Sequence, residues 1–292
     1  MLKAFQKYLD FLLFSNVFIS LGAVAQGLVT YHLINQKSSY LVIGFLFFST
    51  LLTYNLSILI NKPKDYSASK FKRVRWIFGH YRLNISITII SVLSLIPLFL
   101  LLSLGSQILI IFLGILSIGY SIPIISIGKR KVSLRNVPGL KLFLIALVWA
   151  LSSVALPILE LQQNHQFTIS SPDFIILIVK RFLFVVAITI PFDIRDMFQD
   201  STFHLKTIPT VFGEKKANLL CQGMLIFYLV LLFLFQGNGF STDFFALSFT
   251  IILASWLIFK SKWEKNEYYY FLYLDGTLIL QFVILFFFKL VF

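Results

Sequence analysis

Nine long apolar runs constrain this chain more than any other feature of its sequence. Each approaches the length of roughly 17–25 residues that an α-helix needs to cross the hydrocarbon core of a bilayer. Of the 292 residues, 58% are hydrophobic and only 13% are charged, a composition that excludes an ordinary water-soluble domain. The runs cover residues 11–34, 40–60, 84–104, 107–127, 139–160, 173–192, 217–236, 243–260 and 268–290. The sequence therefore predicts an all-α, polytopic membrane bundle of nine transmembrane helices that forms a single domain over residues 1–292.

The distribution of positive charge predicts the orientation of these helices. Of the 25 lysine and arginine residues, all but four lie in the N-terminal segment, in the loops after the second, fourth, sixth and eighth runs, or in their flanks. The four exceptions are Lys37, Lys180, Arg181 and Lys289. Basic loops stay on the cytoplasmic side, so the N-terminus and these loops are expected to be cytoplasmic. Topology thus accounts for the net charge of +13, and no groove-reading motif points to a nucleic-acid partner.

The first apolar run has two interpretations. Lys3 and Lys7, an apolar stretch and then Ala23-Val24-Ala25 resemble a signal peptide with its cleavage site. The apolar run continues beyond this point to Ile34, however, which suits a full transmembrane span better. We therefore expect this run to be the first helix of the bundle.

Three aspartates follow the sixth run. Asp193, Asp196 and Asp200 are three, four and seven residues apart, which on a helix places their carboxylates on one face. Like charges at these spacings repel one another, and the repulsion should grow at the mouth of an apolar helix. A cation between the carboxylates would relieve it. The pattern therefore predicts a divalent metal site, and a phosphate-bearing substrate would explain why a metal is needed there.

The long loop after the second run carries the densest positive charge. Among its basic residues are Lys70, Arg73 and Arg75, and Asp65 is its one acid. The two arginines could clamp phosphate oxygens in a bidentate manner. Equally, the charge could only orient the protein or attract anionic lipid headgroups. The loop alone favours neither interpretation.

Charged residues also interrupt two of the apolar runs. Lys180 and Arg181 lie well inside the sixth run, where basic side chains face a cavity or a partner unless they reach out to the membrane surface. Both alternatives stay open, and Arg181 is the better candidate for a ligand contact. Asp275 lies in the last run, where it is either a site residue or a partner for a basic group.

The segment 193–217, with the helix layout, resembles the UbiA-type intramembrane prenyltransferase superfamily. The matching residues are Asp193-Ile194-Arg195-Asp196, Asp200, Lys206-Thr207-Ile208-Pro209, Gly213 and Ala217. The layout covers nearly the whole chain, whereas the residue-level likeness is strong only over this segment. Its Asp-Ile-Arg-Asp core is most similar to the quinone-pathway branch that prenylates naphthoate.

This resemblance implies a fold and a chemistry. In the family, two aspartate motifs face a central cavity and hold magnesium bound to a prenyl diphosphate, and an aromatic acceptor attacks the allylic carbon. The implied catalytic residues are Asp193, Asp196 and Asp200, of which Asp196 and Asp200 bind Mg²⁺. The resemblance implies Lys206 as a diphosphate contact, and together with the arguments above we expect Asn55, Lys70, Arg73, Arg75 and Arg181 to contact the diphosphate as well. The implied partners are a prenyl diphosphate, a lipophilic acceptor and membrane lipid.

The first aspartate motif departs from the family pattern Asn-Asp-x-x-Asp-x-x-x-Asp. Asn55 matches its asparagine, but the three acidic positions are Leu56, Leu59 and Pro63. A two-magnesium site would therefore lack one of its two ligand groups. The lost acidic residues would have held a magnesium ion. Because Arg and Lys neutralise diphosphate directly, the basic loop could replace part of the positive charge of that ion.

Three functions are compatible with these observations. The leading one is a prenyltransferase that moves an isoprenoid chain to an aromatic or other lipophilic acceptor in quinone-type lipid biosynthesis. The second is a catalytically silent relative that binds an isoprenoid lipid, and the lost acidic residues motivate it. The third is a secondary transporter, supported only by Lys180, Arg181 and Asp275. No paired Gly/Pro-interrupted runs accompany them.

Overall fold

The computed structural model describes residues 2–291, apart from 61, 64, 122–124, 128–129, 133, 135–136, 138, 166, 203–206 and 265. The described chain is mainly helical, and the strands that it contains form one short antiparallel hairpin, β1 (Ile125–Ile127) and β2 (Arg130–Val132). The helices are α1 (Leu2–Phe14), α2 (Val17–Leu33), α3 (Tyr40–Ile60), α4 (Lys72–Gly79), α5 (Tyr81–Leu101), α6 (Leu104–Ser121), α7 (Leu140–Ala150), α8 (Leu156–His165), α9 (Ser171–Thr202), α10 (Ile208–Phe212), α11 (Glu214–Leu234), α12 (Thr242–Lys260) and α13 (Gly276–Val291). Short 3₁₀ and π turns join some of them: η2 (Leu151–Ala155), η3 (Phe235–Gly237), η4 (Ser261–Trp263) and η5 (Tyr269–Leu274).

The expectation of a polytopic helical membrane bundle is confirmed. Seven helices of the described chain are long and apolar enough to cross a membrane, and eight if the bent pair α1 and α2 counts as one span. The apolar part of α6, Leu104–Tyr120, is shorter than the others. The predicted count of nine spans is therefore not established, although a helix covers most of each predicted run.

The first predicted run is bent where it enters the bundle. The axes of α1 and α2 differ by 60° in direction. Asn16, between them, has a φ of 69°, in the left-handed region that asparagine tolerates better than most residues. Its side chain consequently lies at the junction of the two helices.

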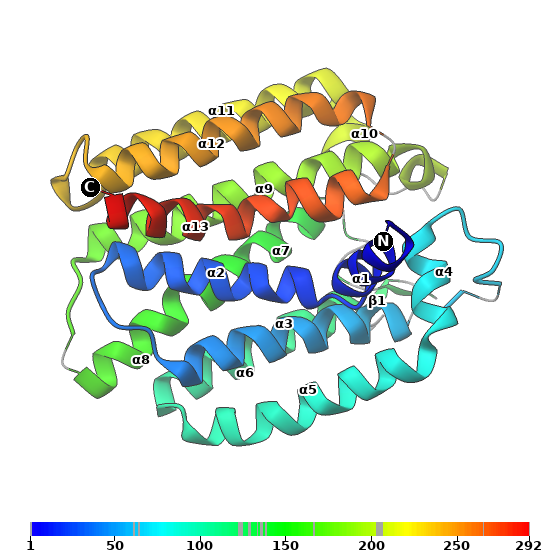
Figure 1. Ribbon diagram of the computed structural model, residues 1–292, viewed down its shortest axis with the longest axis horizontal. Coiled ribbons are helices and arrows are strands. Elements are labelled where there is room, and N and C mark those ends of the chain that lie inside the picture. The colour runs from blue at the N-terminus through cyan, green and yellow to red at the C-terminus, as the bar shows by residue number, and fades with distance from the viewer. Residues whose placement is uncertain are drawn as a thin grey trace.

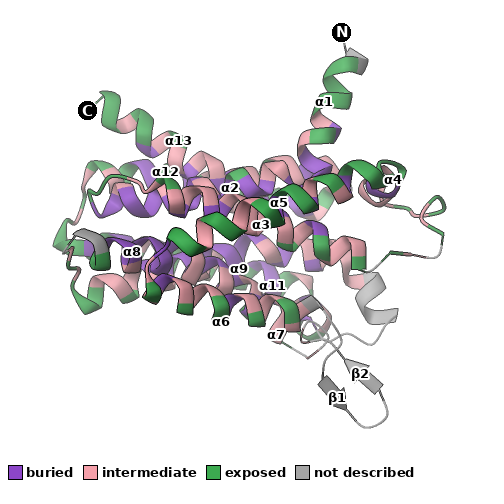
Figure 2. Ribbon diagram, turned by 90° about the horizontal axis from the view of Figure 1, so that it is seen from below, coloured by how far each residue is buried: buried purple, intermediate pink, exposed green. Residues whose placement is uncertain are grey.

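The helices pack side by side with their long axes roughly aligned (Figure 1). The packed pairs include α2 with α3 and α13, α3 with α5, α9 with α7 and α11, and α12 with α11 and α13. In Figure 2 buried residues line the inner faces of these helices, and exposed residues lie outside. Many exposed side chains are large and apolar, such as Ile89, Leu93 and Leu100 of α5, as expected for a surface that faces lipid.

Helices α1, α4 and α10 gather at one end of the bundle (Figure 1), which we call the site end. Contacts between distant segments fix this arrangement. Lys72 of α4 pairs with Asp10 of α1 at 2.9 Å, and Glu267, from the segment after α12, accepts hydrogen bonds from the first turn of α4. The N-terminal segment and the loops after the second and eighth runs therefore lie together, as the alternation of charge predicted. Which side of the membrane they face stays a prediction.

Candidate functional site

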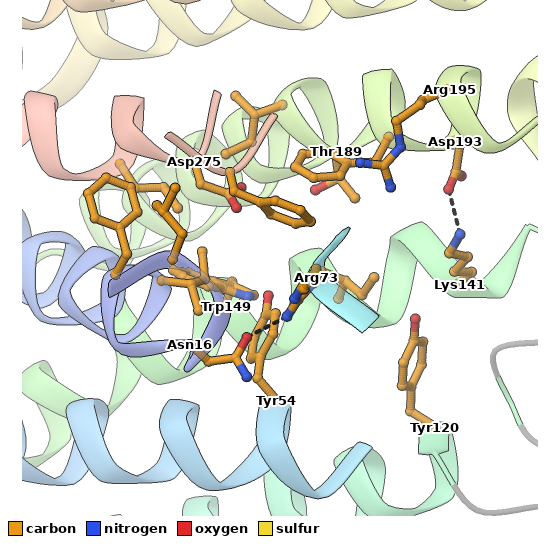
Figure 3. Close-up of a pocket in the computed structure, with 18 residues that line it drawn as sticks. Asn16, Tyr54, Arg73, Tyr120, Lys141, Trp149, Thr189, Asp193, Arg195 and Asp275 are labelled. Carbon is orange, nitrogen blue, oxygen red and sulfur yellow. Dashed lines mark hydrogen bonds and ion pairs between the residues drawn. The ribbon is translucent and has the colours of Figure 1, made fainter. Parts of the chain in front are cut away.

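A cavity of about 290 Å³ lies inside the bundle, toward the site end (Figure 3). Segments from much of the sequence contribute to its wall. The polar lining residues are Asn16, Tyr54, Arg73, Tyr120, Lys141, Thr189, Asp193, Arg195 and Asp275. The apolar and aromatic ones are Leu13, Phe18, Ile19, Ile145, Trp149, Ile188, Phe192, Phe271 and Leu278. The cavity thus combines a cluster of charges with a wall of aromatic and aliphatic side chains.

A partly buried ion pair at the cavity wall links α7 to α9. Lys141 Nζ lies 2.6 Å from Asp193 Oδ1, and the Asp193 side chain is only 1% exposed. A buried carboxylate is costly without a partner, and Lys141 supplies the compensating charge. Asp193 Oδ2 receives no hydrogen bond from the described residues. Lys141 was not predicted as a site residue; the available signal was a lysine just inside the apolar run 139–160.

A second positively charged side chain, Arg195, lies two residues beyond Asp193 along α9. Its guanidinium binds the Asp196 carboxylate through two contacts, Nε to Oδ1 at 2.8 Å and Nη2 to Oδ2 at 3.0 Å. The same group lies 4.8 Å from the centre of the Tyr270 ring and 5.4 Å from that of Phe192, which orients its plane. Its Nη1 has no partner among the described residues, so a donor remains for an anion in the cavity.

Arg73, near the start of α4, is the third positively charged side chain of the cavity. Its guanidinium donates a hydrogen bond to Asn16 Oδ1 and lies 4.7 Å from the centre of the Phe271 ring. Asn16 in turn donates from Nδ2 to Asn55 Oδ1 at 3.0 Å. Asn55 is buried, and its own Nδ2 donates to the carbonyl oxygens of Ser15 and Leu51. Asn55 therefore acts on the cavity indirectly, by orienting Asn16.

The position of Arg73 also depends on Glu267. The two carboxylate oxygens of Glu267 accept the backbone N–H groups of Lys72 and Arg73, at 2.5 and 3.1 Å. These are N–H groups that a helix start leaves without an intrahelical partner, and a carboxylate there also interacts favourably with the helix dipole. Burial lowers the pKa of the Arg73 guanidinium, and the Asp275 carboxylate opposes that shift. Arg73 stays charged, because an arginine has a very high pKa to begin with.

Asp275 follows directly on the π turn η5 and lines the cavity. Arg73 and Arg195 are the charged groups that act on it most strongly. No described residue donates a hydrogen bond to its carboxylate. The sequence left open whether Asp275 is a site residue or the partner of a basic residue. In the structure Asp275 lines the cavity and lies near two basic residues, Arg73 and Arg195.

The predicted site residues have different environments in the described chain. Arg73 and Asp193 line the cavity, while Asn55 and Asp196 contact lining residues without lining it themselves. Lys70 is exposed. Arg75 is also exposed and donates to the Ser69 carbonyl oxygen, within its own loop. The Asp200 side chain and all of Lys206 lie outside the described residues.

Lys180 and Arg181 lie in a different part of the bundle from the cavity lining. They are only 2% and 6% exposed, so neither side chain reaches out to the surface. Arg181 donates to the Gln26 carbonyl oxygen at 3.0 Å and to Thr30 Oγ1 at 3.2 Å. The ammonium of Lys180 lies over the rings of Tyr228 and Phe235. Both therefore have partners inside the protein.

The described residues do not complete a two-magnesium centre of the family type, and the Asp200 side chain lies outside them. They contain no group of three or more His, Cys, Asp or Glu side chains that could hold a metal ion. Asp193 and Asp196 are each paired with a base, and the first-motif positions are Leu56, Leu59 and Pro63. Within this part of the chain, the positive charge of the cavity comes from Arg73, Lys141 and Arg195.

Together, the fold and the cavity define a class of protein: a membrane helical bundle with an internal cavity that has a charged end and an aromatic wall. The sequence profile of the UbiA prenyltransferase family matches residues 82–274, more than half of the chain. The chain therefore belongs to the UbiA prenyltransferase family, as the resemblance in its aspartate segment indicated. The comparison with curated proteins found no match.

Solved structures of UbiA homologues share the fold. The apo homologue from Aeropyrum pernix K1 superimposes with a TM-score of 0.64 at 10% identity, covering 94% of this chain and 98% of its own. The homologue from Archaeoglobus fulgidus, bound to DMAPP and Mg²⁺, gives 0.59 at 15% identity, with coverage of 97% and 98%. A digeranylgeranylglyceryl phosphate synthase gives 0.54 at 16% identity, with 98% of both chains covered. At these identities the likeness shows the fold alone.

Proposed function

We propose that this protein transfers an isoprenoid chain from a prenyl diphosphate to an aromatic or other lipophilic acceptor within the membrane. One observation carries the proposal: Arg73, Lys141 and Arg195 converge from three helices on one cavity that also has an aromatic wall. A prenyl diphosphate has the matching chemistry, since one end is strongly anionic and the other is an apolar chain. Membership of the family and the DMAPP bound to the A. fulgidus homologue support this substrate class.

The positively charged side chains of Arg73, Lys141 and Arg195 would bind the diphosphate and stabilise it as the leaving group. Arg73 and Arg195 present planar guanidinium groups that match phosphate oxygens in a bidentate manner, and Lys141 supplies a compact charge. As the allylic C–O bond breaks, negative charge accumulates on the leaving diphosphate. Bases fixed beforehand by Asn16, Asp193 and Asp196 stabilise that charge without having to reorganise.

The aromatic wall would serve the other half of the reaction. Trp149, Phe18, Phe192 and Phe271 present ring surfaces to the cavity. Ring faces attract a developing allylic cation, and a wall of this kind excludes the water that would otherwise capture it. The lining therefore favours transfer to a lipophilic acceptor over hydrolysis.

Two finer parts of the proposal concern the metal and the pathway. The Mg²⁺ bound to the A. fulgidus homologue supports a magnesium requirement here, for which the expected ligands are Asp196 and Asp200. The Asp-Ile-Arg-Asp core at residues 193–196 supports an acceptor of the quinone-precursor type. We expect the aspartate segment to face the cytoplasm, because of the charge distribution between the loops.

The test is turnover by the purified protein in lipid nanodiscs. Dimethylallyl, geranyl, farnesyl and geranylgeranyl diphosphate are each combined with hydroxybenzoate or dihydroxynaphthoate, with and without Mg²⁺. We expect a prenylated product from at least one pair, and its loss in Arg73→Ala and Arg195→Ala but not in Lys289→Ala, a change at the exposed far end. Full turnover in both Asp196→Asn and Asp200→Asn would contradict the metal assignment.

The second candidate is a silent relative that binds a prenyl diphosphate without turnover. The apolar residues at the first-motif positions and the pairing of Asp193 and Asp196 with bases favour it. Diphosphate binding that is independent of Mg²⁺, with no product from any acceptor, would identify this function. Substrate-dependent uptake into proteoliposomes would test the transporter hypothesis.

A further inference from the structure

We propose that Asp275 is a catalytic residue: it is the base that accepts the proton an aromatic acceptor loses when it is prenylated. The inference rests on the proposed transferase function and adds a residue to it. In the family pattern, the catalytic carboxylates belong to the two aspartate motifs, whereas Asp275 lies on the last helix.

The local helix geometry turns Asp275 toward the cavity. The Asp275 N–H donates to the carbonyl oxygen of Tyr270, five residues earlier, at 3.1 Å, which closes the π turn η5. A π turn shifts the phase of the helix that follows it, and such turns are frequent at functional sites. Leu278, three residues further along α13, lines the same cavity, so this face of the helix is the one that lines the cavity.

Within the described part of the chain, Asp275 differs from the other two aspartates around the cavity in having no ion pair. Lys141 neutralises Asp193, and Arg195 neutralises Asp196. The Asp275 carboxylate receives no hydrogen bond from the described residues. The charged and titratable groups that act on it are Arg73 on α4, Arg195 on α9 and Tyr54 on α3. A carboxylate in this setting keeps its oxygens available to a ligand.

The position of Asp275 also suits the acceptor rather than the diphosphate. In the view of Figure 3, Asp275 and Trp149 lie toward one side, the Lys141–Asp193 pair lies toward the other, and Arg73 lies between them. A diphosphate bound by Arg73, Lys141 and Arg195 would occupy the charged side. The aromatic acceptor would then lie against Trp149, with Asp275 beside the ring carbon that is attacked.

The reaction balances with these groups alone. The allylic C–O bond breaks and its electron pair leaves on the diphosphate. A ring carbon of the acceptor forms the new C–C bond to the allylic carbon, which leaves the ring positively charged. The C–H bond at that carbon then breaks, its proton passes to an Asp275 carboxylate oxygen, and its electron pair restores the aromatic ring. Because such a ring cation is a strong acid, a carboxylate is an adequate base for this proton.

The experiment measures two products at once, in nanodiscs, with geranyl diphosphate and hydroxybenzoate (or the pair that wild type uses). One product is the prenylated acceptor; the other is prenyl alcohol, formed when water captures the allylic cation. In Asp275→Asn we expect transfer to fall about 100-fold, a typical contribution of one general base, while prenyl alcohol persists. The affinity for geranyl diphosphate should not weaken, because the removed charge is negative.

Three outcomes would overturn the inference. If Asp275→Asn transfers at the wild-type rate, no proton goes to Asp275. If transfer and hydrolysis fall together, with weaker diphosphate binding, Asp275 only holds Arg73 and Arg195 in place. If the Asn variant does not fold, Asp275→Glu decides, since a displaced carboxylate should lower the ratio of transfer to hydrolysis and an unchanged ratio contradicts the role. Wild-type protein without transfer to any acceptor would instead refute the proposed function, and this inference with it.

Discussion

Lys141 Nζ lies 2.6 Å from Asp193 Oδ1, and this pair joins α7 to the first aspartate of the segment that dominates the sequence. The contact changes the charge balance that the sequence predicted for that segment. A row of three carboxylates on one helical face predicted a cation between them. In the structure a lysine and an arginine neutralise two of the three, so the charge balance of the site is set by bases as well as acids.

The first prediction concerns the stability of this pair. Lys141→Met leaves the buried Asp193 carboxylate without its partner and should lower the free energy of unfolding by about 3–5 kcal/mol. Thermal unfolding in detergent measures the effect, with Lys37→Met, an exposed lysine, as the matched control. The double variant Lys141→Met/Asp193→Asn should recover most of the loss; if it is no more stable than Lys141→Met alone, the pair is not the cause.

The second prediction compares two arginines that the sequence treated alike. Arg73 lines the cavity, whereas Arg75 is exposed and bonds within its own loop. Arg73→Ala should weaken prenyl diphosphate binding by roughly 10- to 100-fold, because it removes a charged hydrogen-bond donor worth about 1.5–3 kcal/mol. Arg75→Ala should leave binding nearly unchanged. Isothermal titration with a non-hydrolysable diphosphate analogue distinguishes them, and equal effects would mean that the loop acts only through its overall charge.

The third prediction concerns Glu267, which caps α4. Glu267→Ala removes the acceptor for the Lys72 and Arg73 N–H groups and should destabilise this helix start by about 0.5–2 kcal/mol. Because α4 carries Arg73, the affinity for the diphosphate should fall as well. Glu264→Ala is the control from the same segment, since the one ion pair of Glu264 among the described residues is with the exposed Lys260, at 3.6 Å. Equal diphosphate affinities in the two variants would show that the Glu267 cap does not determine the position of Arg73.

The fourth prediction concerns removal of the metal. Because Arg73, Lys141 and Arg195 supply positive charge to the cavity, prenyl diphosphate should still bind after Mg²⁺ is chelated, with an affinity within about tenfold of the original. Binding is measured separately from turnover, so that a metal needed only for the reaction is not mistaken for one needed for affinity. Complete loss of binding on chelation would show that carboxylate-bound metal, and not the bases, holds the diphosphate.

The fold followed from the sequence because its cause is local. A run of apolar residues has one stable form in a bilayer, a helix with its backbone hydrogen bonds satisfied internally, so the apolar runs predicted the helices directly. Boundaries were less certain where the chain departs from a regular helix. The bend at Asn16 and the π turn before Asp275 depend on how neighbouring helices pack, and neither has a periodic signal.

The candidate site was predictable only in part. The spacing of Asp193, Asp196 and Asp200, and the resemblance they carry, pointed to the correct family and to the part of α9 where Asp193 lines the cavity. Lys141, Asn16 and Glu267 were missed as site residues, because each acts through a residue distant in sequence. Their partners Asp193, Arg73 and the start of α4 become neighbours only when the helices assemble.

The sequence by itself determined the class of this protein: a bundle of apolar helices with its basic loops alternating along the chain and an aspartate segment of the UbiA type. Length, hydropathy and charge act through the bilayer, so they need no knowledge of which helix lies beside which. Only the tertiary structure decided how the charges pair. An ion pair or a hydrogen bond depends on a distance of a few ångströms between helices, and that distance left two aspartates neutralised and the carboxylate of Asp275 available to the cavity.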